Sequence, residues 1–280
     1  MILYFTPGGR LGNQLFQYAF LTRVARPREV CITTRMEQLQ EVIEPRLRIW
    51  NVRAGLFYSL LDRLILPLLV RPLCRVGLLG LVAENRSGGL NERRGLIPGV
   101  RVVEGYFQRE SFVPPGLRSR LELREPLMRR ARQIVAGLPA GTTRVFVHVR
   151  RTDLKDFPVR GVPDPRLPLA YYERLLDRVN REIARPFFIF LTDDPDWVDR
   201  TFAGVHDRLV SRQTPGVDLA LMTLCDTAIL SNSSLSWWGA FLMRDGSTRY
   251  CPKYWLGWKS RAWHPDGIRP SFAVAVEVPL

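Results

Sequence analysis

From residue 144 onward, apolar strand-like runs alternate with helix-like segments, and this alternation constrains the fold more than any other feature of the chain. The predicted strands are RVFVHV, PFFIFLT and TAILSN. The predicted helices are LAYYERLLDRVNREIA, DPDWVDRTFAG, VDLALMTLC and SLSWWGAFLM. This order favours a parallel sheet with helices on both faces. Ligands of such sheets bind beyond the carboxyl ends of the strands.

The start of the chain has a similar pattern. ILYF predicts a strand, TPGGRLGN a glycine-rich turn, and residues 14–25 a helix that ends before Pro27. The glycines let the backbone approach a ligand closely, and the helix N-terminus offers free N–H groups to an anion. Most turns of this kind, however, only connect two elements.

The length of 280 residues is enough for two domains. We expect an N-terminal domain over residues 1–140 and a Rossmann-like C-terminal domain over residues 141–280, because the regular alternation begins close to that point. The intervening residues 28–140 show irregular helical patterns and no repeat of fixed period.

The chain is strongly basic, with 41 Lys and Arg against 27 Asp and Glu and a formal net charge of +14. This favours an anionic partner, although a biased genome can produce the same composition. The arginines form no single stripe with interleaved aromatic residues, so we expect no nucleic-acid binding. The four cysteines are widely spaced and predict neither a zinc site nor a disulfide scaffold.

Residues 56–83 are rich in leucine, but charged residues and two prolines break their apolar runs well before the length of a membrane span. Two alternatives remain open, a leucine and arginine surface that lies on an anionic membrane, and a buried helical hairpin with its arginines outward. The first residues do not have the pattern of a signal peptide. We therefore expect a cytoplasmic, bacterial protein that could lie at the inner face of the membrane.

Three polar clusters follow three of the predicted strands. They are His148, Arg150, Arg151 and Asp153; then Thr192, Asp193 and Asp194; then Asn232, Ser233 and Ser234. Strand alternation puts His148 and Arg150 on one face and Val147 and Val149 on the other. A pair of guanidinium groups can bracket a diphosphate without a metal. The convergence of the clusters predicts a binding site for such an anion.

Each cluster also has a purely structural interpretation. Ser233 or Ser234 could be only the N-cap of the next helix. Asp193 and Asp194 could only begin a helix before Pro195 and complement its dipole. His148 alone would more often be a core residue with a satisfied ring.

Six segments occur together and in order as they do in the α-1,2-fucosyltransferases of glycosyltransferase family 11, which this chain closely resembles. They are GGRLGNQLFQYAF, GYFQRESF, VHVRRTDL, AYYERLL, FLTDDPDWV and DLALMTLCDTAILSNSSLSWWGAFL. The resemblance implies an α/β fold of the GT-B type, with two Rossmann-like domains that face each other across a cleft. Residues 1–140 would form the acceptor side, and residues 141–280 would bind a GDP-sugar.

The implied reaction is inverting transfer of L-fucose from GDP-β-L-fucose to the 2-hydroxyl of a galactose-type acceptor. It would use no metal or other cofactor and would give an α-1,2 linkage on a surface glycan or glycolipid. Alternatives are another GDP-sugar or another linkage, a basic nucleic-acid-binding protein, and a catalytically silent binder of the same fold.

The resemblance assigns the catalytic step to residues near the VHVRRTDL segment. Arg150 would neutralise the departing β-phosphate, and Arg151 would support that site. Asp153 is the best candidate for the base that deprotonates the acceptor, with Asp156 and Glu110 in reserve. An equal alternative is that Asp153 only pairs with the arginines and orients them.

The resemblance implies that the remaining donor-binding residues are Asn13, His148, Asp193, Asp194, Ser233 and Ser234. His148 and one aspartate would contact guanosine, the serines would hydrogen-bond the diphosphate, and Asn13 would reach across the cleft. Trp237 and Trp238 are interpreted as packing residues. Thr152 stands where the family often has glycine, a change expected to leave donor binding intact.

Overall fold

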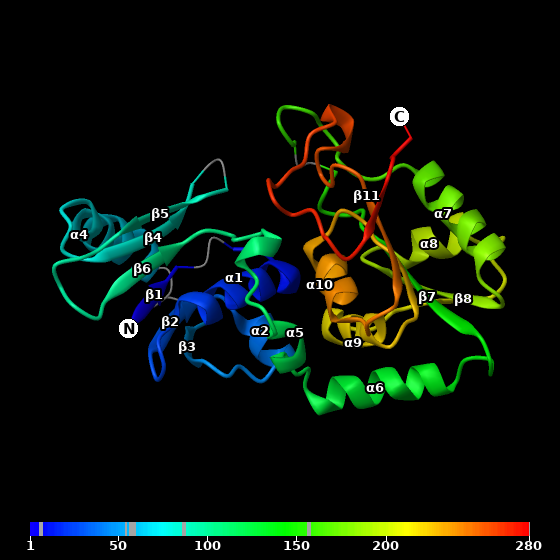
Figure 1. The fold of residues 1–280 in the computed structure, drawn as a ribbon, viewed down its shortest axis with the longest axis horizontal. Helices are drawn as coiled ribbons and strands as arrows, with labels where there is room; N and C mark the ends of the chain where they lie inside the picture. Colours follow the sequence, from blue (N-terminus) through cyan, green and yellow to red (C-terminus); the bar gives the residue numbers. More distant parts are fainter. Residues whose placement is uncertain (6–7, 54, 56–59, 86–87, 156–157, 280) are drawn as a thin grey trace. The chain divides into compact units, whose positions relative to one another are not determined.

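The computed structural model describes residues 1–5, 8–53, 55, 60–85, 88–155 and 158–279 (Figure 1). The chain divides into two compact units, Met1–Glu122 and Leu123–Leu280. The described residues of each unit form a six-stranded sheet with helices. Each unit is therefore an α/β structure, as the family resemblance implies for both units and the alternation of apolar patterns predicts for the C-terminal unit.

All neighbouring strands of the C-terminal sheet pair in parallel, in the order β12-β11-β10-β7-β8-β9. The strands are β7 (Thr143–Val149), β8 (Pro186–Thr192), β9 (Arg208–Val210), β10 (Thr227–Ile229), β11 (Thr248–Pro252) and β12 (Val274–Val276). From β7 the chain moves outward to β8 and β9, and then returns to β10 on the other side. This is the order of the dinucleotide-binding fold, and its switch point lies between β7 and β10.

The helices of this unit include the four that the sequence predicts, over residues 169–184, 194–204, 217–225 and 234–243. The helices are α6 (Glu125–Ala136), α7 (Leu169–Glu182), α8 (Pro195–Thr201), α9 (Pro215–Thr223) and α10 (Ser234–Leu242), with the short turn η3 (Trp258–Ser260). Val145, Val147 and Val149 of β7 pack in one core cluster with residues of α7, whereas buried Phe146, which alternates with them as His148 does, is not part of that cluster. The predicted alternation along β7 is therefore confirmed.

The boundary between the two compact units lies between Glu122 and Leu123, earlier in the chain than the expected boundary after residue 140. The reason is α6, which packs against α9 and so belongs to the C-terminal unit. The sequence alone does not predict this packing, because the amphipathic pattern of α6 does not indicate against which unit its apolar side packs.

The N-terminal sheet has the order β3-β2-β1-β6-β4-β5, with β5 antiparallel to β4 and the other pairs parallel. Its strands are β1 (Ile2–Tyr4), β2 (Val30–Thr34), β3 (Arg48–Val52), β4 (Gly80–Glu84), β5 (Leu90–Arg93) and β6 (Arg101–Glu104). Its helices are α1 (Leu11–Val24), α2 (Glu37–Val42), η1 (Leu61–Val70), α4 (Arg71–Arg75), η2 (Glu110–Phe112) and α5 (Leu117–Arg120). The first helix begins earlier than predicted, at Leu11.

The described part of residues 56–83 does not form a helical hairpin, and that alternative is wrong. Helices η1 and α4 make one continuous helical segment, which ends before Gly77, whose φ of +78° favours glycine. The chain then enters the sheet as β4. Among the described residues, no helix has both the length and the apolar character that a membrane span requires.

We predict that Gly239→Ala lowers the free energy of unfolding by about 1–3 kcal/mol, because overpacking displaces a closely packed neighbour. A Cβ atom at Gly239 of α10 would lie 2.8 Å from Cβ of Met222 on α9 and would also clash with its sulfur. Urea denaturation measures the change. Gly204→Ala is the matched control, since a Cβ there meets nothing within 4 Å, and equal effects of the two changes would contradict the packing argument.

Candidate active site

The three predicted polar clusters meet at the carboxyl ends of adjacent strands β10, β7 and β8. Nδ1 of His148, at the end of β7, lies 2.7 Å from Oγ of Ser231, which follows β10. Nε of Arg150 lies 3.3 Å from Oδ2 of Asp193, which follows β8. The predicted convergence of the clusters is therefore confirmed, and it occurs at the switch point of the sheet.

His148 is buried, with 3% of its surface exposed. Burial, followed by the nearby charge of Arg150, lowers the pKa of His148 to about 3, against an opposite effect of Asp193. The imidazole is therefore neutral near pH 7. Ser231 occupies one ring nitrogen, so this histidine can orient a neighbour or hydrogen-bond a ligand but carries no charge to an anion.

Arg150 supplies the fixed positive charge of this sheet edge. Its Nε donates to Oδ1 of Asp153 at 2.7 Å, and its Nη2 donates to Oδ2 of the same carboxylate. This pairing uses the Nε–Nη2 edge of the guanidinium, and Asp193 lies against the same Nε. The five donors of arginine are rigidly arranged, so the Nη1 side is where a phosphate oxygen would approach.

Asp153 is held in this bidentate pair with Arg150. The geometry favours the interpretation that Asp153 orients Arg150, because a carboxylate with both oxygens engaged is a poor proton acceptor. Of the two reserve bases, Glu110 lies in η2 of the N-terminal unit. Asp156 falls outside the described residues.

Asp193 fixes the loop that follows β7. Its Oδ1 accepts from the backbone N–H of Arg151 at 2.9 Å, and its Oδ2 accepts from the N–H and the hydroxyl of Thr152 at 3.1 and 2.5 Å. Burial alone would raise the pKa of Asp193, but the hydrogen bonds from Thr152 and the charge of Arg150 outweigh it and lower the pKa. Asp193 is thus an ionised anchor of the arginine loop.

Asp194 and Arg151 both contact Trp197 of α8, beside this loop. Asp194 is the N-cap of α8, and its side chain accepts from the N–H of Trp197 at 3.2 Å. The guanidinium carbon of Arg151 lies 3.6 Å from the ring centre of Trp197, in cation–π geometry. Burial, followed by the charge of Arg166, lowers the pKa of Arg151. Stacking on Trp197 fixes the Arg151 side chain, and its supporting role in the site stays a prediction.

The third cluster begins α10. Ser233 is the N-cap, with its hydroxyl accepting from the N–H of Leu235 at 3.3 Å, and Ser234 is the first helical residue. Asn232 donates from Nδ2 to the carbonyl of Pro165 at 2.7 Å, which ties this loop to the proline-rich segment after β7. The cap and the helix N-terminus together form a local positive pole next to β7.

Trp237 and Trp238 are fully buried in α10. Their rings contact each other, and Nε1 of Trp237 donates to the carbonyl of Ile268 at 3.0 Å. The prediction that they are packing residues is confirmed. They hold α10 in place and so set the position of its N-terminus.

Asn13 lies in α1 of the N-terminal unit, where its Oδ1 accepts from Nε2 of Gln108 at 2.5 Å. It is thus tied to the GYFQRESF segment, a second sequence motif of the same unit. Its proposed contact with a donor bound by the other unit stays a prediction.

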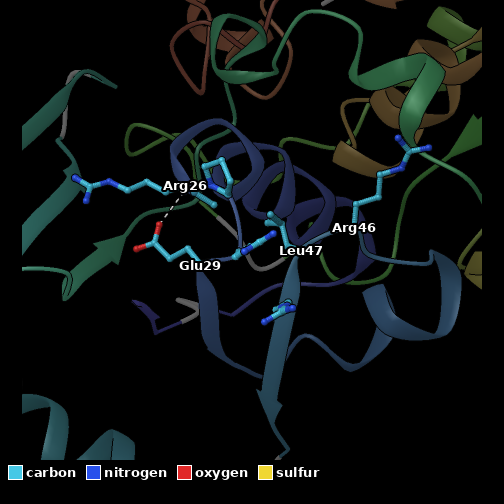
Figure 2. Close-up of a pocket in the computed structure, with 8 residues that line it drawn as sticks. Arg26, Glu29, Arg46 and Leu47 are labelled. Carbon is cyan, nitrogen blue, oxygen red and sulfur yellow. Dashed lines mark hydrogen bonds between the residues drawn. The ribbon is translucent and has the colours of Figure 1, made fainter.

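A hollow of about 410 Å³ also lies in the N-terminal unit and is lined largely by arginines (Figure 2). The side chains of Arg26 and Arg46 extend in opposite directions there. Glu29 accepts from the N–H of Arg26 at 2.8 Å and pairs with Arg101 at 2.6 Å. Because the charges diverge or are already paired, we do not assign the active site to this hollow.

Within the part of the chain that the structure describes, no group of three or more His, Cys, Asp or Glu side chains could hold a metal ion. The four cysteines are buried and free. The prediction of a metal-independent reaction is not tested by this finding and stays a prediction.

Sequence reasoning missed three residues that organise the site. Ser231 hydrogen-bonds His148, Thr152 donates its hydroxyl to Asp193, and Trp197 lies under Arg151. Ser231 lies inside the predicted strand TAILSN and could have been found by following that strand to the same sheet edge. The role of Trp197 could not have been predicted, because nothing in the sequence indicates which arginine stacks on its ring.

Two α/β units with mainly parallel sheets are the architecture of the GT-B fold class. The solved structure of fucosyltransferase NodZ from Bradyrhizobium resembles the chain with a TM-score of 0.54 at 12% identity, over 86% of this chain and 92% of NodZ. At this identity the likeness concerns the fold alone. The predicted fold class is confirmed.

The chain belongs to glycosyl transferase family 11, whose sequence profile matches residues 103–261. Galactoside α-(1,2)-fucosyltransferase 1 of Rattus norvegicus is 28% identical over 271 residues, which cover 90% of this chain and 66% of that protein. The O-antigen biosynthesis glycosyltransferase WbnK of Escherichia coli is 32% identical over 100 residues, or 34% of this chain and 33% of WbnK. The chain thus spans between a third and two thirds of these two relatives.

A third relative matches over nearly its whole length. The α-1,2-colitosyltransferase of Escherichia coli is 26% identical over 272 residues, which cover 89% of this chain and 90% of that protein. The predicted family is confirmed by these matches, and with it the class of glycosyltransferases.

We predict that His148→Asn makes the stability of the protein less sensitive to acid. An unfolded histidine has a pKa of about 6.5, so between pH 7 and pH 5 the unfolded wild type binds a proton that the folded state excludes. Wild type should therefore lose about 2 kcal/mol more than the variant over this range. The pKa of buried Asp218 is raised to about 7 by burial and acts in the opposite direction, but it is common to both proteins.

Unfolding free energies of both proteins at the two pH values give this difference. Equal losses would mean that His148 is protonated in the folded protein, which contradicts the buried neutral ring.

Proposed function

We propose that the protein transfers L-fucose from GDP-β-L-fucose to the 2-hydroxyl of a galactose-type acceptor, with inversion at the sugar carbon. The observation that carries the proposal is the position of Arg150 at the carboxyl end of β7, beside the switch point with β10 and linked through Asp193 to β8. The names of the family relatives support the sugar and the linkage.

The proposed mechanism follows from where charge develops. As the bond from the fucose carbon to the diphosphate breaks, positive charge grows on the sugar ring and negative charge grows on GDP. Arg150 is held in advance by two carboxylates, so its donors need little reorganisation to stabilise the leaving diphosphate. The N-terminus of α10, with Ser233 and Ser234, would bind further phosphate oxygens.

The remaining residues have supporting roles in this proposal. His148 and Asp193 would border the guanosine, and Asp193 would do so while holding the arginine loop. The C-terminal unit would bind the donor, and the N-terminal unit with Asn13 would bind the acceptor. The acceptor would be a galactose-containing glycan or glycolipid, in surface glycan biosynthesis by a bacterial enzyme that works in the cytoplasm.

A second candidate is transfer of a different deoxy sugar with the same linkage. The full-length match to an α-1,2-colitosyltransferase favours it specifically, because that relative is named for another sugar. The arginine and helix N-terminus would act on the diphosphate alike in both reactions. Only the residues that contact the sugar ring would differ.

The function is tested by a screen of GDP-sugars against simple galactosides, with and without EDTA. We expect GDP release with GDP-fucose in both conditions and an α-1,2-linked product by linkage analysis. Activity with another GDP-sugar alone would move the assignment to the second candidate. Loss of activity in EDTA would contradict the metal-free scheme.

We predict that Arg150→Ala lowers kcat by a few hundredfold, about 3–4 kcal/mol, because a donor to the developing charge is removed. Arg150→Lys should recover little, since a point charge does not replace the guanidinium fork. Steady-state transfer kinetics measure both. The control is Arg212→Ala, which removes an exposed arginine paired with Asp196 and Asp199 in the same unit. A folded Arg150→Ala protein with the wild-type rate would refute the assignment.

A further inference from the structure

The helical segment η1–α4 exposes a row of apolar side chains. Leu60, Leu64, Leu68 and Val76 are exposed, with Leu68 at 70%, and they follow one another at intervals of four or eight residues. Residues four apart lie on the same side of a helix. Exposed Pro72 completes the interval of four. The side chains of this outer row are not part of the buried cluster under the segment.

The opposite side of the same segment is packed. Leu66, Val70 and Cys74, again four apart, form a buried cluster with Val102 of the sheet. Because the inner row alone accounts for the attachment of the segment, the leucines of the outer row are not needed to hold the fold together.

A neighbouring loop extends the exposed apolar surface. The N–H of Leu96 donates to the carbonyl of Gly77, and that of Ile97 to the carbonyl of Leu78, both at 2.9 Å. Leu96 is 78% exposed and Ile97 is also exposed. We call the surface made by Leu60, Leu64, Leu68, Leu69, Val76, Leu96 and Ile97 the apolar face. Exposed apolar side chains on one helical segment and on the loop hydrogen-bonded to its end are typical of an interaction site.

Trp50 lies on the same side of the sheet as the apolar face. It pairs in register with Ile32, and Ile32 pairs with Leu3, which packs against the cluster under η1. Register partners of neighbouring strands point to the same face of a sheet. Trp50 is 69% exposed on the edge strand β3, and exposed tryptophan is typical of membrane–water interfaces.

The charges on the same elements are mainly positive. Arg71 and Arg75 are exposed on α4, and Arg93 and Arg94 are exposed just before Leu96. Acidic residues on these and neighbouring elements include Asp62 on η1, Glu84 on β4, exposed Glu92, and Glu104, which lies 3.6 Å from Arg71. A second copy of this chain would bring like charges together, whereas anionic lipid head groups complement them.

We propose that the apolar face binds the surface of a bilayer that contains anionic phospholipid. The leucines insert at the level of the head groups, and the arginines at their margin pair with lipid phosphates. This binding goes beyond the proposed function and does not depend on it. Its consequence is that the N-terminal unit is held where an acceptor on a lipid carrier would be presented.

Vesicle flotation without donor or acceptor tests the proposal. We expect the full chain to float with vesicles of phosphatidylglycerol and phosphatidylcholine in equal parts, and to stay at background with phosphatidylcholine alone. The double change Leu64→Asp with Leu68→Asp should reduce flotation to background. The matched control, Leu169→Asp with Val274→Asp, alters two exposed apolar residues of the other unit and should float like wild type.

The charge arm uses Arg75→Glu with Arg94→Glu, which should weaken binding to the anionic vesicles about thirtyfold or more, since each basic residue near the surface contributes about 1 kcal/mol. Arg129→Glu with Arg174→Glu, on α6 and α7, makes the same change of net charge and should have no comparable effect. Equal binding to both vesicle types would overturn the proposal. Normal flotation of the Leu64→Asp and Leu68→Asp variant would also overturn it. The same holds if sedimentation shows that the only effect of this variant is to dissociate a dimer.

Discussion

The parallel pairing of β7 with β10 is the constraint on which the site depends. The chain leaves β7 in one direction and returns to β10 from the other, so the loops after these strands diverge and leave room beyond the sheet edge. The contact of His148 with Ser231 fixes the two strand ends to each other. Because that histidine is buried and neutral, all the positive charge at the edge comes from arginine and from the start of α10.

Arginine at this position needs its carboxylate partners. A guanidinium that is partly removed from water loses hydration, and its ion pairs with Asp153 and Asp193 compensate for that loss before any ligand arrives. Asp193 has a second effect, since it also accepts two backbone N–H groups of the same loop. The loop and the charge are therefore set by one side chain, which is the kind of preorganisation that electrostatic catalysis requires.

The sequence predicted three neighbouring strands of the C-terminal sheet, β7, β8 and β10, and the convergence of their polar clusters, because strand alternation and parallel order together determine which residues share an edge. It could not predict the end of the N-terminal unit, since the apolar side of α6 fits either neighbour until α9 is placed beside it. Nor could it decide between a base and an orienting role for Asp153, which depends on where the Arg150 side chain turns. The sequence indicated helix in the leucine-rich region that contains residues 60–75, but it did not indicate the strand β4 that follows. Runs of leucine are compatible with both a helix and a strand.

A crystal structure with GDP-fucose, or with GDP where the sugar is lost, tests the central claim most directly. The account predicts that the diphosphate lies at the carboxyl end of β7, with Arg150 donating to the β-phosphate and the N-terminus of α10 donating to neighbouring oxygens. A diphosphate bound away from that edge, or coordinated by a divalent metal ion instead of the guanidinium, would contradict it.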